Sequence, residues 1–237
     1  MANSFFRFKQ FTVNQERCAM KVGTDGVLLG AWCDVSCASE ILDVGTGTGL
    51  IALMLAQRNS SAKICGIEID NDAAEQALEN VNGSPWSDRV KIENVSFQNF
   101  TLSTERSFDL IVSNPPYFCN SLKNPDGRKS TARHTDDLPF EDLLECSAKL
   151  LKNNGKLAIV IPVTEGNLFV KLAGNVGLSC SKRVEVCPKP NSDPKRLLLE
   201  FTKSKTETKT DTLVIETETR HCYSPEFKNL TKDFYLK

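Results

Sequence analysis

The segment EILDVGTGTGLIALMLAQR, residues 40–58, constrains the fold of this chain more than any other stretch. Its first residues form a short apolar run of the kind found in buried parallel strands. Its second half has apolar residues at helical spacing. Gly45, Gly47 and Gly49 separate the two halves, so few side chains obstruct the turn from strand to helix. This unit predicts an α/β sheet with a ligand-binding turn at its edge.

The alternation of strands and helices continues beyond this unit. Apolar runs predict strands, and amphipathic runs of good helix formers predict helices. The expected strands are 62–70, 89–97, 108–113, 156–162, 178–188 and 196–202, and the expected helices are 24–32, 71–82, 138–152 and 164–177. A further strand is expected after residue 210. Such an order predicts an open α/β sheet with right-handed crossovers.

Local signals predict how three of these helices begin. Thr24 or Asp25 is expected to cap the first helix, and Asn71 or Asp72 the one that starts near residue 71, because short polar side chains accept hydrogen bonds from free backbone N–H groups. Pro139 is expected in the first turn of a third helix, where its missing N–H costs nothing.

Length and composition fit one domain. The chain has 237 residues, of which 40% are hydrophobic and 25% charged, as in ordinary soluble globular proteins. We expect residues 1–40 to form an N-terminal cap, residues 41–203 the core and residues 204–237 a C-terminal extension. A monomer is the expected state.

Cysteine and histidine usage restricts the compartment and the chemistry. The chain contains 9 cysteines, with no CxxC pair, and 2 histidines. An odd number of cysteines, several inside apolar runs, favours free thiols in a reducing compartment. No set with zinc-ligand spacing can be assembled, so no metal is expected. The chain shows neither a signal-peptide pattern nor an apolar run long enough to span a membrane, and we expect a cytoplasmic protein.

Three unusual segments meet at the carboxyl edge of the predicted sheet. They are the glycine turn, Glu68 after the second strand and Asn114–Tyr117 after the fourth. Leu50 stands where a dinucleotide fingerprint needs its third glycine, and no GK[ST] follows, so the nicotinamide and phosphate-loop interpretations both fail. A carboxylate at Glu68 suits the vicinal hydroxyls of a ribose.

At these residues the chain resembles the class I S-adenosylmethionine-dependent methyltransferases. Their Asp-x-Gly-x-Gly-x-Gly motif is matched from Asp43 onward, and their second-strand acid by Glu68. The resemblance implies a Rossmann-like, mostly parallel sheet of seven strands in the order 3-2-1-4-5-7-6, with helices on both faces. In that family an acid often follows the third strand beside the adenine amine, whereas this chain has Ser96 and Phe97, and Phe97 is a candidate to stack on the ring.

The resemblance implies S-adenosyl-L-methionine as cofactor. The candidate cofactor-binding residues are Lys21, Thr24, Asp43, Gly45, Thr46, Gly47, Gly49, Glu68, Ser96, Phe97 and Asn114.

The segment Asn114-Pro115-Pro116-Tyr117 supplies the candidate catalytic residues. An adenine amine is a poor nucleophile because its lone pair is delocalised into the ring. Two acceptors, the Asn114 side-chain oxygen and the Pro115 carbonyl, can bind both amine hydrogens and localise that pair, and prolines hold the loop in a preorganised shape. Tyr117 can stack on the base. The tetrapeptide matches methyltransferases that act on planar amide or amine nitrogens.

Three substrate classes share this loop: DNA adenine, RNA adenine and the glutamine of release factors. The chain has no room for a sizeable DNA-recognition domain, and its first forty residues do not look like the helical domain of the glutamine enzymes. The segment 20–32, SNPPYF and the C-terminal segment from residue 224 resemble bacterial tRNA adenine-N6 methyltransferases that modify adenine 37 of a valine tRNA. In that resemblance Lys21, Gly23, Thr24 and Asp25 close over the cofactor. An inactive cofactor-binding module remains an alternative.

Local charge agrees with an RNA partner. Residues 118–135 carry four Lys or Arg against one Asp, and residues 181–196 five against two acids, a local net charge of +3 in each case on a chain of net charge −1. Segregated basic patches of this kind favour phosphate contacts. The candidate RNA-binding residues are Lys123, Arg128, Lys129, Arg133, Lys182 and Arg183.

Overall fold

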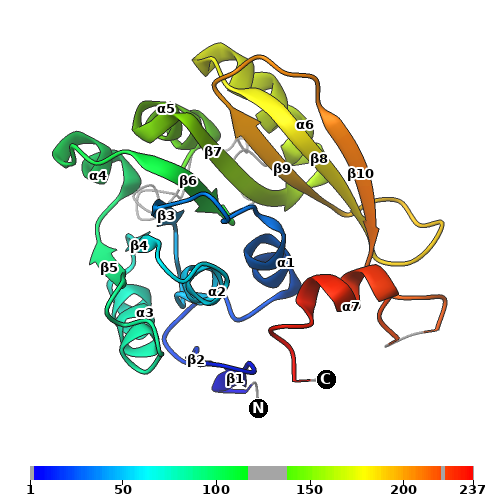
Figure 1. Ribbon diagram of the computed structural model, residues 1–237, viewed down its shortest axis with the longest axis horizontal. Coiled ribbons are helices and arrows are strands. Elements are labelled where there is room, and N and C mark those ends of the chain that lie inside the picture. The colour runs from blue at the N-terminus through cyan, green and yellow to red at the C-terminus, as the bar shows by residue number, and fades with distance from the viewer. Residues whose placement is uncertain (1–2, 117–137, 220–221, 237) are drawn as a thin grey trace, which may run out of the picture.

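One mainly parallel sheet forms the centre of the molecule, and helices cover both of its faces (Figure 1). The computed structural model describes residues 3–116, 138–219 and 222–236. The strands run in the order β10-β8-β9-β7-β6-β3-β4-β5. Their bounds are β3 Glu40–Val44, β4 Lys63–Glu68, β5 Val90–Asn94, β6 Phe108–Ser113, β7 Leu151–Pro162, β8 Ser179–Cys187, β9 Arg196–Thr202 and β10 Lys209–Val214.

From β5 to β8 the strand order is the 3-2-1-4-5-7-6 order that the resemblance implies. The strand β9 runs antiparallel to both of its neighbours, β7 and β8. The expected number of seven strands is wrong for this sheet, because β10 pairs in parallel with β8 and adds an eighth. This pairing is possible because β8 would otherwise leave its backbone hydrogen-bonding groups open along one side.

Two apolar clusters lie on opposite faces of the sheet. The helices α1 (Thr24–Trp32), α2 (Leu50–Arg58) and α3 (Asn71–Asn82) pack on one face, together with α7 (Pro225–Thr231). The helices α4 (Phe97–Ser103), α5 (Phe140–Leu150) and α6 (Val163–Ala173) pack on the other, followed by a short 3-10 turn, Gly174–Val176. In Figure 1 the two sets lie on opposite sides of the strands.

The helix starts differ from the sequence expectations. Asp70 caps α3, since its carboxylate accepts a hydrogen bond of 2.8 Å from the Ala73 N–H, rather than Asn71 or Asp72. Asp70, Asn71 and Asp72 all have side chains that can cap a helix. Asp70 is the cap because its backbone is extended and the helical backbone begins at the next residue. The N-cap of α1 is Gly23, without a side-chain bond, so neither Thr24 nor Asp25 is a cap there.

Two strand boundaries also shift. The strand expected at 89–97 ends at Asn94, because the Ser96 hydroxyl caps a helix that begins at Phe97. Pro139 is the N-cap of α5 rather than part of its first turn, and the helix ends at Leu150. The next strand starts at Leu151, five residues earlier than expected, with an irregular register opposite Phe108.

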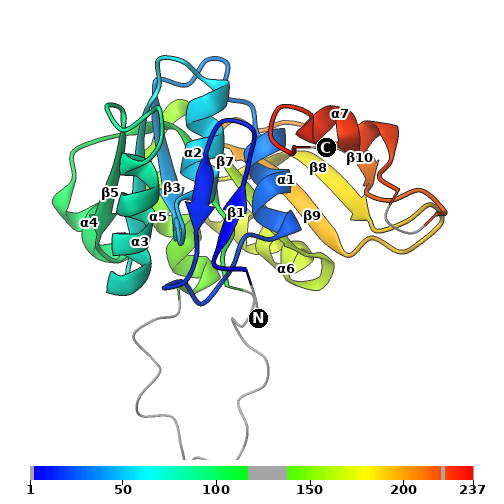
Figure 2. The same ribbon diagram turned by 90° about the horizontal axis from the view of Figure 1, so that it is seen from below.

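The two ends of the chain pack against each other. A hairpin of β1 (Phe5–Arg7) and β2 (Thr12–Asn14) lies between α3 and α1 in the view of Figure 2. Its turn contacts the C-terminal segment, where the Lys9 N–H donates to the Phe234 carbonyl at 2.9 Å and Phe8 stacks on Tyr235. The Asn14 N–H donates to the Asn80 side chain on α3 at 2.8 Å. These contacts fix where the chain enters α1.

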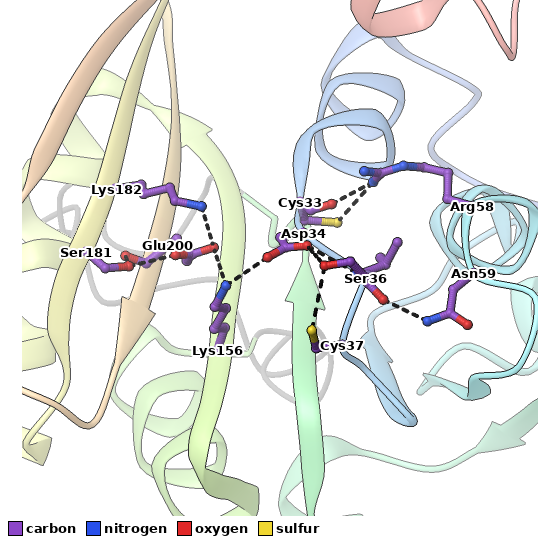
Figure 3. Close-up of polar contacts among 11 residues, drawn as sticks. Cys33, Asp34, Ser36, Cys37, Arg58, Asn59, Lys156, Ser181, Lys182 and Glu200 are labelled. Carbon is purple, nitrogen blue, oxygen red and sulfur yellow. Dashed lines mark hydrogen bonds and ion pairs between the residues drawn. The ribbon is translucent and has the colours of Figure 1, made fainter.

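A nearly buried carboxylate joins β7, β8 and β9. Glu200, with 3% of its surface exposed, accepts a hydrogen bond from the Ser181 hydroxyl at 2.8 Å and pairs with Lys182 and Lys156. Lys156 also pairs with Asp34 at 3.1 Å, beyond the end of α1 (Figure 3). Hydrogen bonds from Ser36, together with Lys156, hold the pKa of Asp34 well below its usual range.

Candidate active site

The turn between β3 and α2 is built from glycines in the left-handed region of φ. The φ angles of Gly45, Gly47 and Gly49 are +68°, +54° and +79°, values that L side chains rarely adopt. The N–H groups of Gly45 and Thr46 both donate to the Ile67 carbonyl at 3.0 Å. The turn is therefore fastened to β4, beside which it lies.

The Asp43 side chain, at the end of β3, holds this turn in place through hydrogen bonds. One oxygen of its fully buried carboxyl group, Oδ2, accepts hydrogen bonds from the Thr46 hydroxyl at 2.6 Å and the Ala52 N–H at 3.1 Å. The other oxygen, Oδ1, has no hydrogen-bond partner within the described parts of the chain. Burial raises the pKa of Asp43 to about 7, and the two hydrogen bonds only partly oppose that rise.

Glu68 ends β4 with its carboxylate bound to backbone N–H groups. One oxygen accepts a hydrogen bond from Gly47 at 2.9 Å, and the other from Ile69 at 2.9 Å and Asp70 at 3.1 Å. These bonds fix the carboxylate beside the glycine turn. Three of the roughly four acceptor positions of the carboxylate are therefore used, and one remains, on the oxygen that binds Gly47.

Two adjoining cavities lie at this edge of the sheet. The larger has a volume of about 1050 Å³ and the smaller about 310 Å³. Met20, Gly45, Gly47 and Asn114 line both. The predicted residues at the larger cavity are Gly45, Gly47, Glu68, Ser96, Phe97, Asn114, Pro115 and Pro116, and those at the smaller one include Lys21, Gly23, Thr24, Asp25 and Thr46.

The glycine turn leaves open space for a ligand. A Cβ added at Gly45 or Gly47 would meet no other atom within 4 Å, although both residues line the cavities. An extended ligand with an adenosine at one end and an amino acid at the other therefore has bare backbone to lie against. The residues fit such a group in size and in the donors and acceptors they offer.

Three of the predicted cofactor-binding residues expose little or no surface to the cavities and instead support the structure around them. Asp43 and Gly49 do not line either cavity; Asp43 lies under the turn, and Gly49 precedes α2 and packs against Ala77. Phe97 lines the larger cavity but is only 4% exposed and belongs to the apolar cluster beneath α4 and α5. Little of its ring is available for stacking.

Asn114, Pro115 and Pro116 follow β6 at the rim between the two cavities. The preceding Ser113 is buried and donates from its hydroxyl to the Val44 carbonyl at 2.9 Å, which ties the end of β6 to the end of β3. Pro115 is buried and Asn114 half-buried. The candidate residues Tyr117, Lys123, Arg128, Lys129 and Arg133 lie outside the described residues.

Comparison with known proteins places these features in a family. A family model described as "Methyltransferase small domain" matches residues 22–173, more than half of the chain. The chain belongs to this methyltransferase family. Curated relatives named tRNA1(Val) (adenine(37)-N6)-methyltransferase are 52% identical over 239 residues in Trichodesmium erythraeum, 51% over 236 in Phocaeicola vulgatus and 49% over 241 in Bacteroides fragilis (strain ATCC 25285). Each alignment covers 100% of this chain and 99–100% of the relative.

Solved structures support the fold alone. A predicted O-methyltransferase from Agrobacterium tumefaciens, Atu636, superposes with a TM-score of 0.71 at 18% identity, over 89% of this chain and 96% of that one. A putative RNA methyltransferase from Pyrococcus horikoshii gives a TM-score of 0.53 at 14% identity, over 76% of this chain and 81% of that one.

The methyltransferase has further cavity residues that the sequence did not single out. Arg17, Cys18 and Ala19 follow the hairpin and line the larger cavity, and Gln98 and Asp142 line it from α4 and α5. Arg17 pairs with Glu75 and Glu79 on α3, which fastens this segment. No pattern around Arg17 marks such a role, because the contacts join segments far apart in the chain.

The two described candidates for RNA contact have carboxylate partners. Lys182 pairs with Glu200 at 3.4 Å, as Figure 3 shows, and Arg183 with Glu185 at 3.0 Å. Arg183 also donates to the Asn167 side chain at 2.9 Å. Their positive charges are thus partly neutralised, and their role in RNA binding stays a prediction.

The described ranges contain no cluster of metal ligands and no membrane-spanning helix. No group of three or more His, Cys, Asp or Glu side chains is placed there to hold a metal ion. No helix within residues 3–116, 138–219 and 222–236 has the length and apolar character needed to cross a membrane.

The pKa of Asp43 predicts an unusual dependence of stability on pH. Because the folded-state pKa, about 7, lies above the unfolded value of 3.8, the folded protein binds more protons between these values and loses stability as the pH rises through them. An Asp43→Asn variant cannot titrate. We expect the free energy of unfolding of this variant, relative to that of wild type, to increase by up to ~1.4 kcal/mol per pH unit between these pKa values and to level off above about pH 7. Urea unfolding of the ligand-free proteins measures this difference.

Asp109→Asn serves as the control. Against the effect of burial, Lys152 and two backbone N–H groups lower the pKa of Asp109. Its carboxyl group is therefore ionised in both states above about pH 5, and the difference from wild type stays constant there. A constant difference for Asp43→Asn as well would contradict the assigned pKa.

Proposed function

We propose that this chain transfers a methyl group from S-adenosyl-L-methionine to the N6 amine of adenine 37 in tRNA1(Val). Relatives with this name align with the whole chain at about half identity. The observation that carries the proposal is the position of Asn114, which borders both cavities beside the glycine turn, since Ser113 pairs with Val44 in the sheet. A nucleophile bound at Asn114 would meet a cofactor bound along the turn.

The proposed cofactor position follows the chemistry of the lining residues. Glu68 offers its remaining carboxylate acceptor position to a ribose hydroxyl, and the smaller cavity, with Lys21 and Thr24, accommodates the charged amino-acid end. When bound, S-adenosyl-L-methionine supplies an electrophilic methyl group at its sulfonium. The chain contributes orientation and proximity, which are large terms in such displacements.

At the nucleophile, the chain supplies acceptors. The Asn114 side-chain oxygen and the Pro115 carbonyl accept the two amine hydrogens, which draws the nitrogen towards tetrahedral geometry and localises its lone pair. The buried Pro115 and the Ser113–Val44 hydrogen bond restrict movement of this loop, so the acceptors are preorganised. Tyr117 is proposed to stack on the target base.

The substrate class is tested by parallel labelling. The protein is incubated with labelled S-adenosylmethionine and, separately, with total RNA, plasmid DNA or a release factor, and the products are digested to nucleosides or amino acids. We expect label in N6-methyladenosine from RNA and specifically from tRNA1(Val). Label in methylglutamine, or only in DNA, would refute the assignment.

Replacement of the proposed acceptor separates binding from chemistry. Asn114→Ala is expected to keep the affinity for S-adenosylmethionine within a few-fold but to lower single-turnover methyl transfer at least ~100-fold, the size of loss seen when a preorganised polar group is removed. Asn153→Ala, the same change at an exposed residue outside both cavities, should leave the rate unchanged. Near-normal turnover by Asn114→Ala would remove Asn114 from the chemistry.

Phosphate binding is tested by the salt dependence of the affinity for tRNA. Arg128→Ala/Arg133→Ala is expected to weaken binding and to reduce the slope of log K against log salt, by roughly 0.7–0.9 for each phosphate that the variant no longer neutralises. Lys182→Ala/Arg183→Ala should reduce it less, because carboxylates already pair with these cations. Equal slopes for wild type and the first variant would exclude these arginines from the RNA interface.

A further inference from the structure

A polar pair, Gln98 and Asp142, forms part of the wall of the larger cavity. The Gln98 side-chain amide on α4 donates to the Asp142 carboxylate on α5 at 2.8 Å. Both side chains are half-buried and line the cavity. Within the described chain this bond is the only hydrogen bond that either side chain makes. One amide hydrogen and one carboxylate oxygen therefore remain for a ligand.

Three other polar side chains along this cavity have different partners. Ser96, which follows β5, uses its hydroxyl oxygen to cap α4 through the Asn99 N–H at 3.2 Å. Glu68 is bound to three backbone N–H groups, and Asp70 caps α3. Of the carboxylates that line the cavity, Asp142 alone stands on the wall formed by α4 and α5.

We propose, on the basis of the proposed function, that Gln98 and Asp142 recognise the edge of the cofactor's adenine. The free Asp142 oxygen accepts a hydrogen from the N6 amine, and the second Gln98 amide hydrogen is donated to N1. An acceptor and a donor held side by side match adenine, which presents N6–H next to an unprotonated N1. The same pair mismatches hypoxanthine, which presents a carbonyl oxygen to the Asp142 acceptor and an N1–H to the Gln98 donor.

The neighbouring residues suit a flat ring between the ribose site and this pair. Ile69 follows Glu68 directly, lines the cavity and is 43% exposed, a large apolar surface left open at a concave site. Leu138 and Pro139 line the same cavity from the start of α5. Burial of the ring against such side chains strengthens its hydrogen bonds to the polar pair, because water is excluded.

The test measures nucleobase preference without RNA or turnover. Binding of S-adenosylhomocysteine and S-inosylhomocysteine is compared by calorimetry for wild type, Asp142→Asn and Gln98→Ala. Wild type is expected to prefer the adenosyl compound at least about tenfold, since a site built for hydrogen bonds rejects a mismatched edge. Asp142→Asn should reduce that preference about tenfold or more, because its amide can donate to the hypoxanthine oxygen. Gln98→Ala should reduce it as well.

Glu145→Gln, the same type of change one turn further along α5 on an exposed side chain, is the matched control and should keep the wild-type preference. Thermal unfolding verifies that each variant is folded. The inference is overturned if wild type binds both compounds equally, or if folded Asp142→Asn keeps the full preference. Failure of wild type to bind S-adenosylhomocysteine at all would instead count against the proposed cofactor.

Discussion

The hydrogen bonds of the buried Asp43 carboxyl group are the interaction on which the site depends. One oxygen binds both the Thr46 hydroxyl and the Ala52 N–H, so a single atom joins the end of a strand, the glycine turn and the first turn of a helix. The turn can pass this close to the strand only because its glycines adopt positive φ. Without this arrangement the cavities at the turn would be filled by side chains, and Glu68 would lose the Gly47 N–H that orients it.

The parallel strands then bring distant residues to one edge. Because β3, β4, β5 and β6 all run the same way, the residues after them, including Glu68, Ser96 and Asn114, surround the same cavity. The buried Glu200 and its two lysines lie on β7, β8 and β9, and none of them lines either cavity. The ion pairs of this cluster are thus separate from the candidate site.

The sequence predicted the alternating elements, the strand order through the family resemblance, and the convergence of Gly45, Glu68 and Asn114, because each follows from local pattern and chain direction. It predicted a further strand after residue 210 but not that this strand, β10, joins the sheet beside β8, because the pairing depends on which side of β8 is left open. Nor did it predict the Gln98–Asp142 pair, which joins residues 44 positions apart. Such contacts depend on how two helices are rotated on the sheet, and composition and periodicity carry little information about that rotation.

The packing of the hairpin on residues 234–235 has a consequence for the support of the cavity wall. The hairpin leads into that wall at Arg17–Met20, and it is fastened by Phe234 and Tyr235. None of residues 222–236 lines either cavity. A substitution that detaches this segment would therefore loosen the wall from a distance, without altering any residue that could contact a ligand.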